Sequence, residues 1–167
     1  DGHYLGAHSD QHLLYCDWNQ REEMLVTRKQ FEEDLGQNYA AMQAFGISKM
    51  EAHYFLPPFE WYNRRISEWT EAQGLQLINF TPGTRSNADY TTPAMKHYAG
   101  SDAIMRHIKE YEGRDPAGLN GFIFLLHIGV GPERTDKFHD RLDELIRWLR
   151  AEKYQMVRVD QLLRSAN

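Results

Sequence analysis

The run GFIFLLHI, residues 121–128, is the most apolar stretch of the sequence and carries a histidine, His127, near its end. A continuous apolar run of this length is typical of a parallel strand that is buried on both faces. Shorter apolar runs alternate with amphipathic segments along the rest of the chain. We therefore predict an α/β fold with a mainly parallel sheet, in which the chemistry collects just after the strands.

The remaining elements follow from this alternation. Asp17, with Gln20 three residues later, is a capping pattern that predicts the start of a long helix. Thr135 is expected to cap another helix, because the apolar residues after it recur at helical spacing. We predict short strands at residues 3–7, 53–56, 75–80 and 156–159, helices at residues 17–45, 63–73 and 101–112, and a long loop at residues 81–100.

Length and composition narrow the class of protein. The chain has 167 residues, of which 41% are hydrophobic and 26% charged, as in an average globular domain. We therefore expect residues 1–167 to form a single domain. A formal charge of −5 argues against a nucleic-acid partner, and no apolar stretch is long enough to span a membrane. The single cysteine, Cys16, forms no internal disulfide, and the sequence leaves the oligomeric state open.

Histidines lie after the first predicted strand and near the end of the most apolar one. His8 and His12 are four residues apart, a spacing that on a helical turn brings two imidazoles to one divalent ion; the alternative is two solvated or capping histidines. His127 is either a core residue or a general acid, since an imidazole titrates near neutrality. Asp89, in the long loop, either forms a turn or orients an imidazole.

The segment after residues 53–56 offers a second candidate. Pro57-Pro58 fixes the backbone, and either ends the strand or aims the amide of Phe59 into a cleft as an oxyanion donor. Several aromatic residues, Trp18 and Trp61 among them, lie in predicted loops. They are either half-buried packing residues or walls of a carbohydrate-binding cleft. The acidic run at residues 32–34 is interpreted as a solvated helix face.

Several segments occur in the order of a known family. Residues 2–12, GHYLGAHSDQH, resemble the motif G-H-x-[IL]-G-x-H-[ST]-x-x-H. Residues 54–59, YFLPPF, resemble F-R-P-P-Y-G, and residues 122–127, FIFLLH, resemble I-[IL]-L-L-H. Residues 74–79 and 145–163 resemble the strand before the family's fourth motif and its last helix and strand. The sequence thus resembles, over nearly its whole length, the polysaccharide deacetylase family, the NodB-homology domain of carbohydrate esterase family 4.

The resemblance implies a distorted (β/α) barrel of the NodB-homology type. The family's first motif, T-F-D-D-G, supplies the catalytic base and a third metal ligand, and it does not occur in the residues before His8. The resemblance therefore implies that residues 1–167 are the C-terminal portion of such a barrel, without its first strand and helix. Leu56 stands where the family has an arginine, and Glu60 where it has a glycine.

The resemblance also implies a reaction and the residues that perform it. The reaction is removal of an N- or O-linked acetyl group from a carbohydrate by a metal-activated water. His8 and His12 match the metal ligands, for Zn²⁺ above all, although Co²⁺ and Ni²⁺ also suit histidine. His127 matches the general acid, and Asp89 the aspartate that supports it. The residues expected to bind substrate are Pro58, Phe59 (with its amide at the oxyanion), Glu60, Trp61 and Tyr90.

The implied partner is an acetylated oligo- or polysaccharide, and the family's usual substrates imply an extracytoplasmic or secreted protein. Two other functions stay open. The absent base and Leu56 favour a non-catalytic carbohydrate-binding protein with a degenerate deacetylase fold. A metallohydrolase of non-sugar amides is the second alternative. Metal content separates the deacetylase from the binding protein, and the substrate that releases acetate separates the two enzymes.

Overall fold

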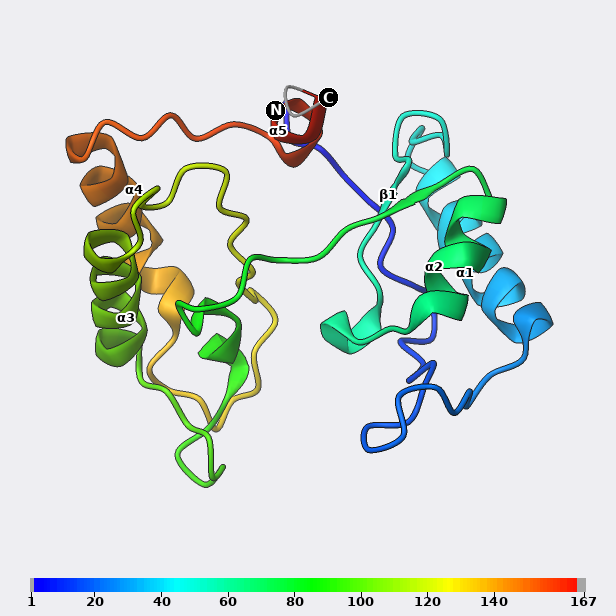
Figure 1. Ribbon diagram of the computed structural model, residues 1–167, viewed down its shortest axis with the longest axis horizontal. Helices are drawn as coiled ribbons and strands as arrows, with labels where there is room; N and C mark the ends of the chain where they lie inside the picture. The colour runs from blue at the N-terminus through cyan, green and yellow to red at the C-terminus, as the bar shows by residue number, and fades with distance from the viewer. Residues whose placement is uncertain (1, 165–167) are drawn as a thin grey trace. The chain divides into compact units, whose positions relative to one another are not determined.

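The computed structural model describes residues 2–164 and divides them into two compact units (Figure 1). Unit 1 comprises residues 2–79 and 158–164, and unit 2 comprises residues 80–157. Each unit has its own cluster of buried hydrophobic side chains, so each is described by itself. A single domain over residues 1–167 stays a prediction.

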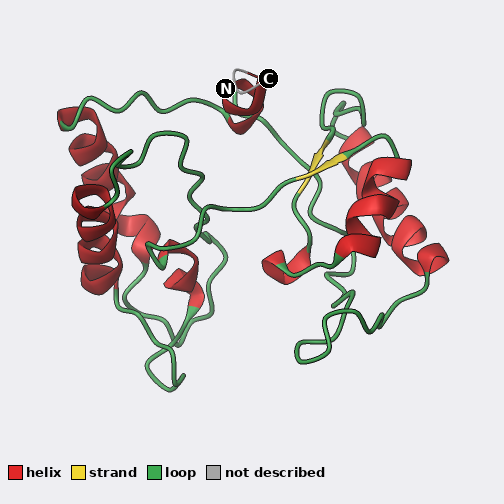
Figure 2. Ribbon diagram, viewed as in Figure 1, coloured by secondary structure: helices red, strands yellow, loops and turns green. Residues whose placement is uncertain are grey.

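Unit 1 contains a short parallel strand pair beside two helices (Figure 2). Tyr54 pairs with Gln76 and Phe55 with Leu77, and Ala7 adds an isolated parallel bridge to Phe55. The parallel pairing agrees with the predicted α/β class. The elements of unit 1 are α1 (Arg28–Gln43), β1 (Tyr54–Phe55), the 3-10 turn η1 (Pro58–Glu60), α2 (Arg64–Ala72), β2 (Gln76–Leu77) and α5 (Val159–Arg164).

The helix predicted from Asp17 begins at Arg28 instead. Asp17 does accept the backbone N–H of Gln20, at 2.8 Å, but this bond closes a turn in the loop. The true cap is Thr27, whose hydroxyl accepts the Gln30 N–H at 3.2 Å while the Gln30 side chain accepts the Thr27 N–H at 2.8 Å. Such a reciprocal capping box satisfies two backbone donors at the start of a helix. The helix therefore begins after Thr27 and not after Asp17.

The predicted strands of unit 1 are shorter than expected or absent. Residues 3–7 contribute only the bridge at Ala7, and residues 75–80 only β2. The strand predicted at residues 156–159 is wrong, because α5 starts at Val159. The helix predicted at residues 63–73 is confirmed as α2, and Asn63 caps it by accepting the Ile66 N–H at 3.1 Å.

Unit 2 is built on two helices that share a core. Ile104 and Ile108 of one helix and Leu145 and Leu149 of the other are buried in the same cluster. The helix predicted at residues 101–112 is confirmed and extends to Arg114. The elements of unit 2 are the 3-10 segment η2 (Ser86–Tyr90), α3 (Ser101–Arg114), the 3-10 turn η3 (Phe138–Arg141) and α4 (Leu142–Ala151).

Thr135 does not cap a helix, because the chain that follows it is tied to the start of α3. The Asp136 carboxylate accepts the Ser101 N–H at 2.6 Å, and the Asp136 carbonyl accepts the Ser101 hydroxyl at 3.2 Å. Helical structure begins only at η3 and continues into α4.

The apolar run at residues 121–128 is not the fully buried strand predicted. Its phenylalanines and leucines are half-buried, and Ile128 is 81% exposed. Its backbone hydrogen bonds include one from the Thr81 N–H to the Ile123 carbonyl, 2.9 Å, one from the Ile123 N–H to the Thr81 hydroxyl, 3.0 Å, and one from the His127 N–H to the Asp89 carboxylate, 2.6 Å. Within residues 2–164 no strand pairs with this run, and a strand forms only where a neighbour completes its hydrogen bonds.

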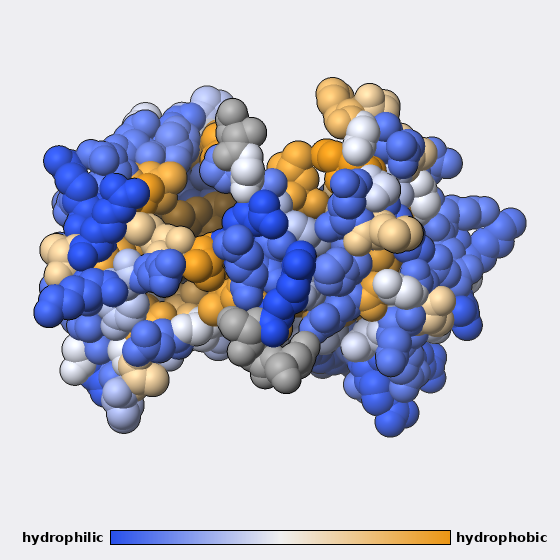
Figure 3. All heavy atoms as spheres, turned by 90° about the horizontal axis from the view of Figure 1, so that it is seen from above, coloured by the Kyte–Doolittle hydropathy of each residue, from blue (hydrophilic) through white to orange (hydrophobic). Residues whose placement is uncertain are grey.

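Hydrophobic residues also reach the surface, as orange patches among mainly hydrophilic residues (Figure 3). None of the helices within residues 2–164 combines the length and the apolar character that a membrane crossing needs.

Candidate active site

The first group of candidate residues lies in unit 1, on the loop that follows the bridge at Ala7. The His8 N–H donates to the Asn38 side chain at 3.1 Å, and its ring nitrogen Nδ1 lies 2.9 Å from the Leu56 carbonyl oxygen. Since a carbonyl only accepts, this bond requires the proton on Nδ1, and in the neutral ring it leaves Nε2 with its lone pair. Backbone carbonyls orient metal-binding histidines in this way.

A buried carboxylate holds the loop between the two histidines. Asp34 is 5% exposed and accepts three hydrogen bonds: from the Ser9 hydroxyl at 2.7 Å, the Gln11 N–H at 2.7 Å and the Tyr15 hydroxyl at 2.9 Å. Burial raises the pKa of Tyr15, and the Asp34 charge raises it further, so the phenol stays a neutral donor. The interpretation of residues 32–34 as a solvated face is therefore wrong for Asp34.

His12 completes this group. Its backbone has a φ of 52°, the left-handed region, and its N–H donates to the Ser9 hydroxyl at 2.9 Å. The ring centroids of His8 and His12 are 5.1 Å apart. Two imidazoles, one with its tautomer set, suit a zinc site that keeps open positions. Across residues 2–164, however, no three His, Cys, Asp or Glu side chains are grouped to hold an ion.

The Pro57-Pro58 segment turns sharply beside His12. Phe59 and Glu60 both have left-handed φ angles, 59° and 55°, which are uncommon outside glycine. The Phe59 ring lies 4.5 Å from the His12 ring. In the described part of the chain no acceptor takes the Phe59 N–H, so this donor is available to a ligand. Residues held in rare backbone conformations cluster at functional sites.

The second group of candidate residues lies in unit 2. Asp89, at the end of η2, is 1% exposed. One carboxylate oxygen accepts the His127 N–H at 2.6 Å, and the other lies 2.6 Å from the ring nitrogen Nδ1 of His127. The ring of Tyr90, which is exposed, lies 5.3 Å from the His127 ring. The carboxylate thus fixes both the backbone and the imidazole of His127.

The structure brings the predicted residues together in two sets. His8, His12 and Phe59 are neighbours in unit 1, and Asp89, His127 and Tyr90 in unit 2. Pro58, Glu60 and Trp61 belong to the turn at Phe59. The predicted roles of all these residues stay predictions. Sequence reasoning missed Asp34. Its hydrogen-bond partner Tyr15 is 19 residues away in the sequence and comes close to it only in the folded chain, so no local pattern marks Asp34.

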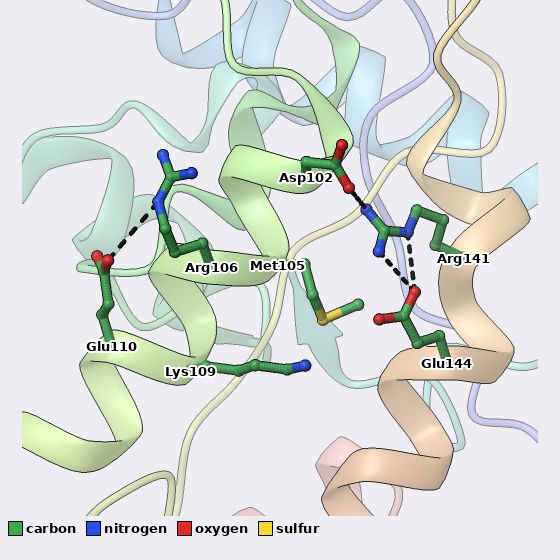
Figure 4. Close-up of a pocket in the computed structure, with 7 residues that line it drawn as sticks. All are labelled: Asp102, Met105, Arg106, Lys109, Glu110, Arg141 and Glu144. Atoms are coloured by element: carbon green, nitrogen blue, oxygen red, sulfur yellow. Dashed lines mark hydrogen bonds and ion pairs between the residues drawn. The ribbon is translucent and has the colours of Figure 1, made fainter.

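The surface of unit 2 also has a hollow of about 440 Å³ between α3 and the η3–α4 segment (Figure 4). Its charged groups are largely matched: Arg141 pairs with Asp102 and Glu144, and Arg106 with Glu110. Paired surface charges of this kind offer little to a ligand, so the hollow is not a candidate site. It is lined by Asp102, Met105, Arg106, Lys109, Glu110, Arg141 and Glu144.

Solved structures of carbohydrate esterase family 4 (CE4) share this fold. BA3943, a CE4 family pseudoenzyme from Bacillus anthracis, matches with a TM-score of 0.63 and 14% identity, over 95% of this chain and 45% of that chain. A BA3943 mutant with restored enzymatic activity matches with a TM-score of 0.65 and 16% identity, over 95% of this chain and 47% of that chain. The Bc1960 peptidoglycan N-acetylglucosamine deacetylase matches with a TM-score of 0.67 and 14% identity, over 96% of this chain and 63% of that chain.

The likeness confirms the expected resemblance at the level of the fold. This chain spans about half the length of the BA3943 structures and 63% of the Bc1960 structure. No family model matches the sequence, and no curated protein matches it either. Because the CE4 structures include both a pseudoenzyme and a deacetylase, the fold alone does not decide between activity and binding.

Proposed function

We propose that this chain is part of a metal-dependent carbohydrate deacetylase, which removes acetyl groups from an oligo- or polysaccharide within a barrel of the CE4 type. The observation that carries the proposal is the His8–His12 pair: His8 has its tautomer set by Leu56, and His12 lies against Phe59. Contacts that orient both imidazole rings are typical of a ligand site, whereas histidines that only face solvent are not held in one orientation.

His8 and His12 are the residues that hold the metal in this proposal. Zn²⁺ bound there supplies a Lewis acid for the acetyl carbonyl and lowers the pKa of a water. The ring proton of His8 on Nδ1, held by Leu56, directs Nε2 to ligation.

The remaining residues handle charge and protons. The Phe59 N–H, which has no acceptor among the described residues, donates to the oxygen that becomes negative during attack. His127 gives a proton to the leaving nitrogen or oxygen, and Asp89 keeps the imidazole oriented and stabilises its charged form. Glu60, Trp61 and Tyr90 contact the sugar.

The test is acetate release by the full-length protein from penta-N-acetylchitopentaose and from acetylated xylan, with and without a chelator. The proposal predicts release from at least one glycan, lost with the chelator and restored by Zn²⁺. Release only from a non-sugar acetamide contradicts the carbohydrate assignment.

A non-catalytic carbohydrate-binding protein is the second candidate, favoured by the lack of a third ligand among residues 2–164 and by the BA3943 pseudoenzyme in the same fold. Glycan binding with no acetate release from any of these substrates, Zn²⁺ present, would establish it instead.

A further inference from the structure

Arg134 is a buried cation in unit 2, and its side chain is 1% exposed. Its nitrogen Nη1 donates to the Thr91 carbonyl at 2.6 Å and to the Ala99 carbonyl at 3.0 Å, and Nη2 donates to the Ser101 hydroxyl at 3.4 Å. A guanidinium can do this because its planar fork donates in several fixed directions at once. Burying a cation is costly, so Arg134 points to a requirement for fixed geometry at this place.

The first acceptor, Thr91, ends the segment that carries Asp89. Thr91 directly follows η2, and its N–H and its hydroxyl both donate to the Ala88 carbonyl, at 3.0 and 2.6 Å. The Thr91 hydroxyl also accepts the Ala99 N–H at 3.2 Å. Arg134 joins the Thr91 and Ala99 carbonyls, and so fixes the end of η2 two residues after Asp89.

Arg134 itself belongs to the segment that follows His127 in the sequence. The Arg134 N–H donates to the Gly131 carbonyl at 3.1 Å, which closes a turn in this segment. The chain after His127 is therefore joined to the chain after Asp89 at a second place, apart from the contact between the two side chains.

We propose that Arg134 is a positioning residue, which keeps the Asp89 carboxylate on the His127 imidazole by fixing the two segments that carry this pair. Arg134 is too buried to touch a substrate, so it acts only through the pair. A contact of 2.6 Å between the carboxylate and Nδ1 tolerates little displacement of either segment. The consequence for turnover rests on the proposed function, in which His127 is the general acid.

Two substitutions at Arg134 test this role. Arg134→Met keeps a long side chain but removes every donor, so the Thr91 and Ala99 carbonyls lose these bonds. Arg134→Lys keeps the charge, but its single ammonium lacks the planar fork, so we expect a smaller change in the same direction. Leu149→Ala is the control for a general loss of stability, because Leu149 is buried in the core of unit 2 and its side chain makes none of these hydrogen bonds.

The experiment is nitrogen-15 NMR of the histidine-labelled, full-length protein, in chelator and without substrate, at a mildly alkaline pH where a free imidazole is neutral. The spectrum reports which ring nitrogen of His127 holds the proton. A carboxylate only accepts, so we expect the proton on Nδ1 in wild type and in Leu149→Ala. In Arg134→Met we expect a ring that is averaged between the two tautomers.

The kinetic counterpart is acetate release by the zinc-loaded, full-length protein. In Arg134→Met kcat should fall about 10- to 100-fold while KM stays unchanged, because a displaced general acid acts only in the transition state. In Leu149→Ala kcat should stay close to that of wild type. Circular dichroism melting measures the loss of stability in each variant.

A proton that stays on Nδ1 of His127 in folded Arg134→Met overturns the inference; if the methionine variant does not fold, the same result in Arg134→Lys does so. A ring that is averaged in wild type overturns it too, as does a change in Leu149→Ala as large as that in Arg134→Met.

The NMR measurement needs neither metal nor substrate, so it separates this inference from the proposed function. A changed His127 ring in Arg134→Met, with no acetate release by wild type, refutes the proposed function alone. Acetate release by wild type, with the His127 ring and kcat both unchanged in Arg134→Met, refutes this inference alone.

Discussion

Asp34 is the residue on which the loop between His8 and His12 depends most directly. Its carboxylate takes donors from Ser9, Gln11 and Tyr15, all of them on or beside the loop. An asparagine at this position offers one acceptor and turns an NH₂ group toward a donor, which leaves buried polar groups unsatisfied.

We therefore expect Asp34→Asn to weaken zinc binding by about 10- to 100-fold, the range for supporting residues around a metal. Competition with a chelator of known affinity measures this. Glu33→Gln is the control, since Glu33 is exposed on the same helix and forms a surface ion pair with Lys29 at 3.6 Å. Equal zinc affinity in wild type and Asp34→Asn would show that the loop keeps its conformation without the Asp34 carboxylate.

Asp89 is the corresponding positioning residue in unit 2. In Asp89→Asn the contact to the His127 ring is with a neutral amide, which neither stabilises the charged imidazole nor keeps its tautomer. Turnover should fall about 100-fold or more while zinc affinity stays that of wild type. Steady-state kinetics and zinc titration measure the two effects, and Asp140→Asn, at an exposed aspartate, should change neither. A parallel loss of zinc affinity would contradict the separation of roles.

Which residues the sequence can predict depends on how local their signal is. His8, His12 and His127 stand beside apolar runs, a local signal that marks them as candidates, whereas the partners of His8 and His127 come from distant segments. Asp34 lies 25 residues from Ser9 and 19 from Tyr15, so its burial appears only after α1 packs beside the loop. The same holds for Trp18, whose partner Trp61 comes from a distant segment.

Helices and strands, too, are predicted well only where their signal in the sequence is local. The helices α2 and α3 are found close to their predicted bounds, because caps and apolar periodicity are local. Strands need partners, and the runs at residues 3–7 and 121–128 pair little within residues 2–164, so apolar composition alone overpredicted them.

The long loop before η2 depends on a glycine that no other residue replaces easily. Gly83 has a φ of 123°, and a Cβ there would lie 2.5 Å from the ring of Tyr111 on α3. Gly83→Ala should therefore destabilise the protein by about 2 kcal/mol or more. Gly36→Ala is the contrasting control, because Gly36 lies in α1 with open space around it and should stabilise by about 0.5–1 kcal/mol. Urea unfolding measures both, and equal stabilities would contradict the close packing of Gly83 on Tyr111.

At the scale of the whole chain, residues 2–79 and 158–164, which are far apart in the sequence, belong to one unit. Asp160 is buried and bonds Arg158 at 2.8 Å and Arg164 at 2.9 Å, and Arg158 also donates to the Gly2 carbonyl at 3.1 Å. The hydrogen bond from Arg158 lowers the pKa of Asp160, and the charges of Arg158 and Arg164 add to this.

A lowered pKa means that the folded state favours the carboxylate, so this stabilisation is complete above the ordinary aspartate pKa of about 3.9 and is lost as the pH falls through the lowered value. Asp160→Asn should therefore be less stable than wild type near pH 6, and the difference should shrink below about pH 4. Urea unfolding at several pH values measures it. Asp143→Asn, at an exposed ion pair, should show almost no difference. A difference that does not change with pH would contradict the ion-pair account.

The likeness to the CE4 fold was recognisable from motif order in the sequence, although the solved CE4 structures are only 14–16% identical to it. We predict that each motif places a group at the site, while the packing between the motifs tolerates many substitutions.

The account depends most on His8 and His12 sharing one zinc ion. Calorimetric titration of the metal-free, full-length protein with Zn²⁺ tests this most directly. We predict one tight site in wild type and in the control His53→Ala, and its loss in His12→Ala. Zinc stoichiometry that is unchanged in His12→Ala, or the absence of a tight site in wild type, would contradict the account.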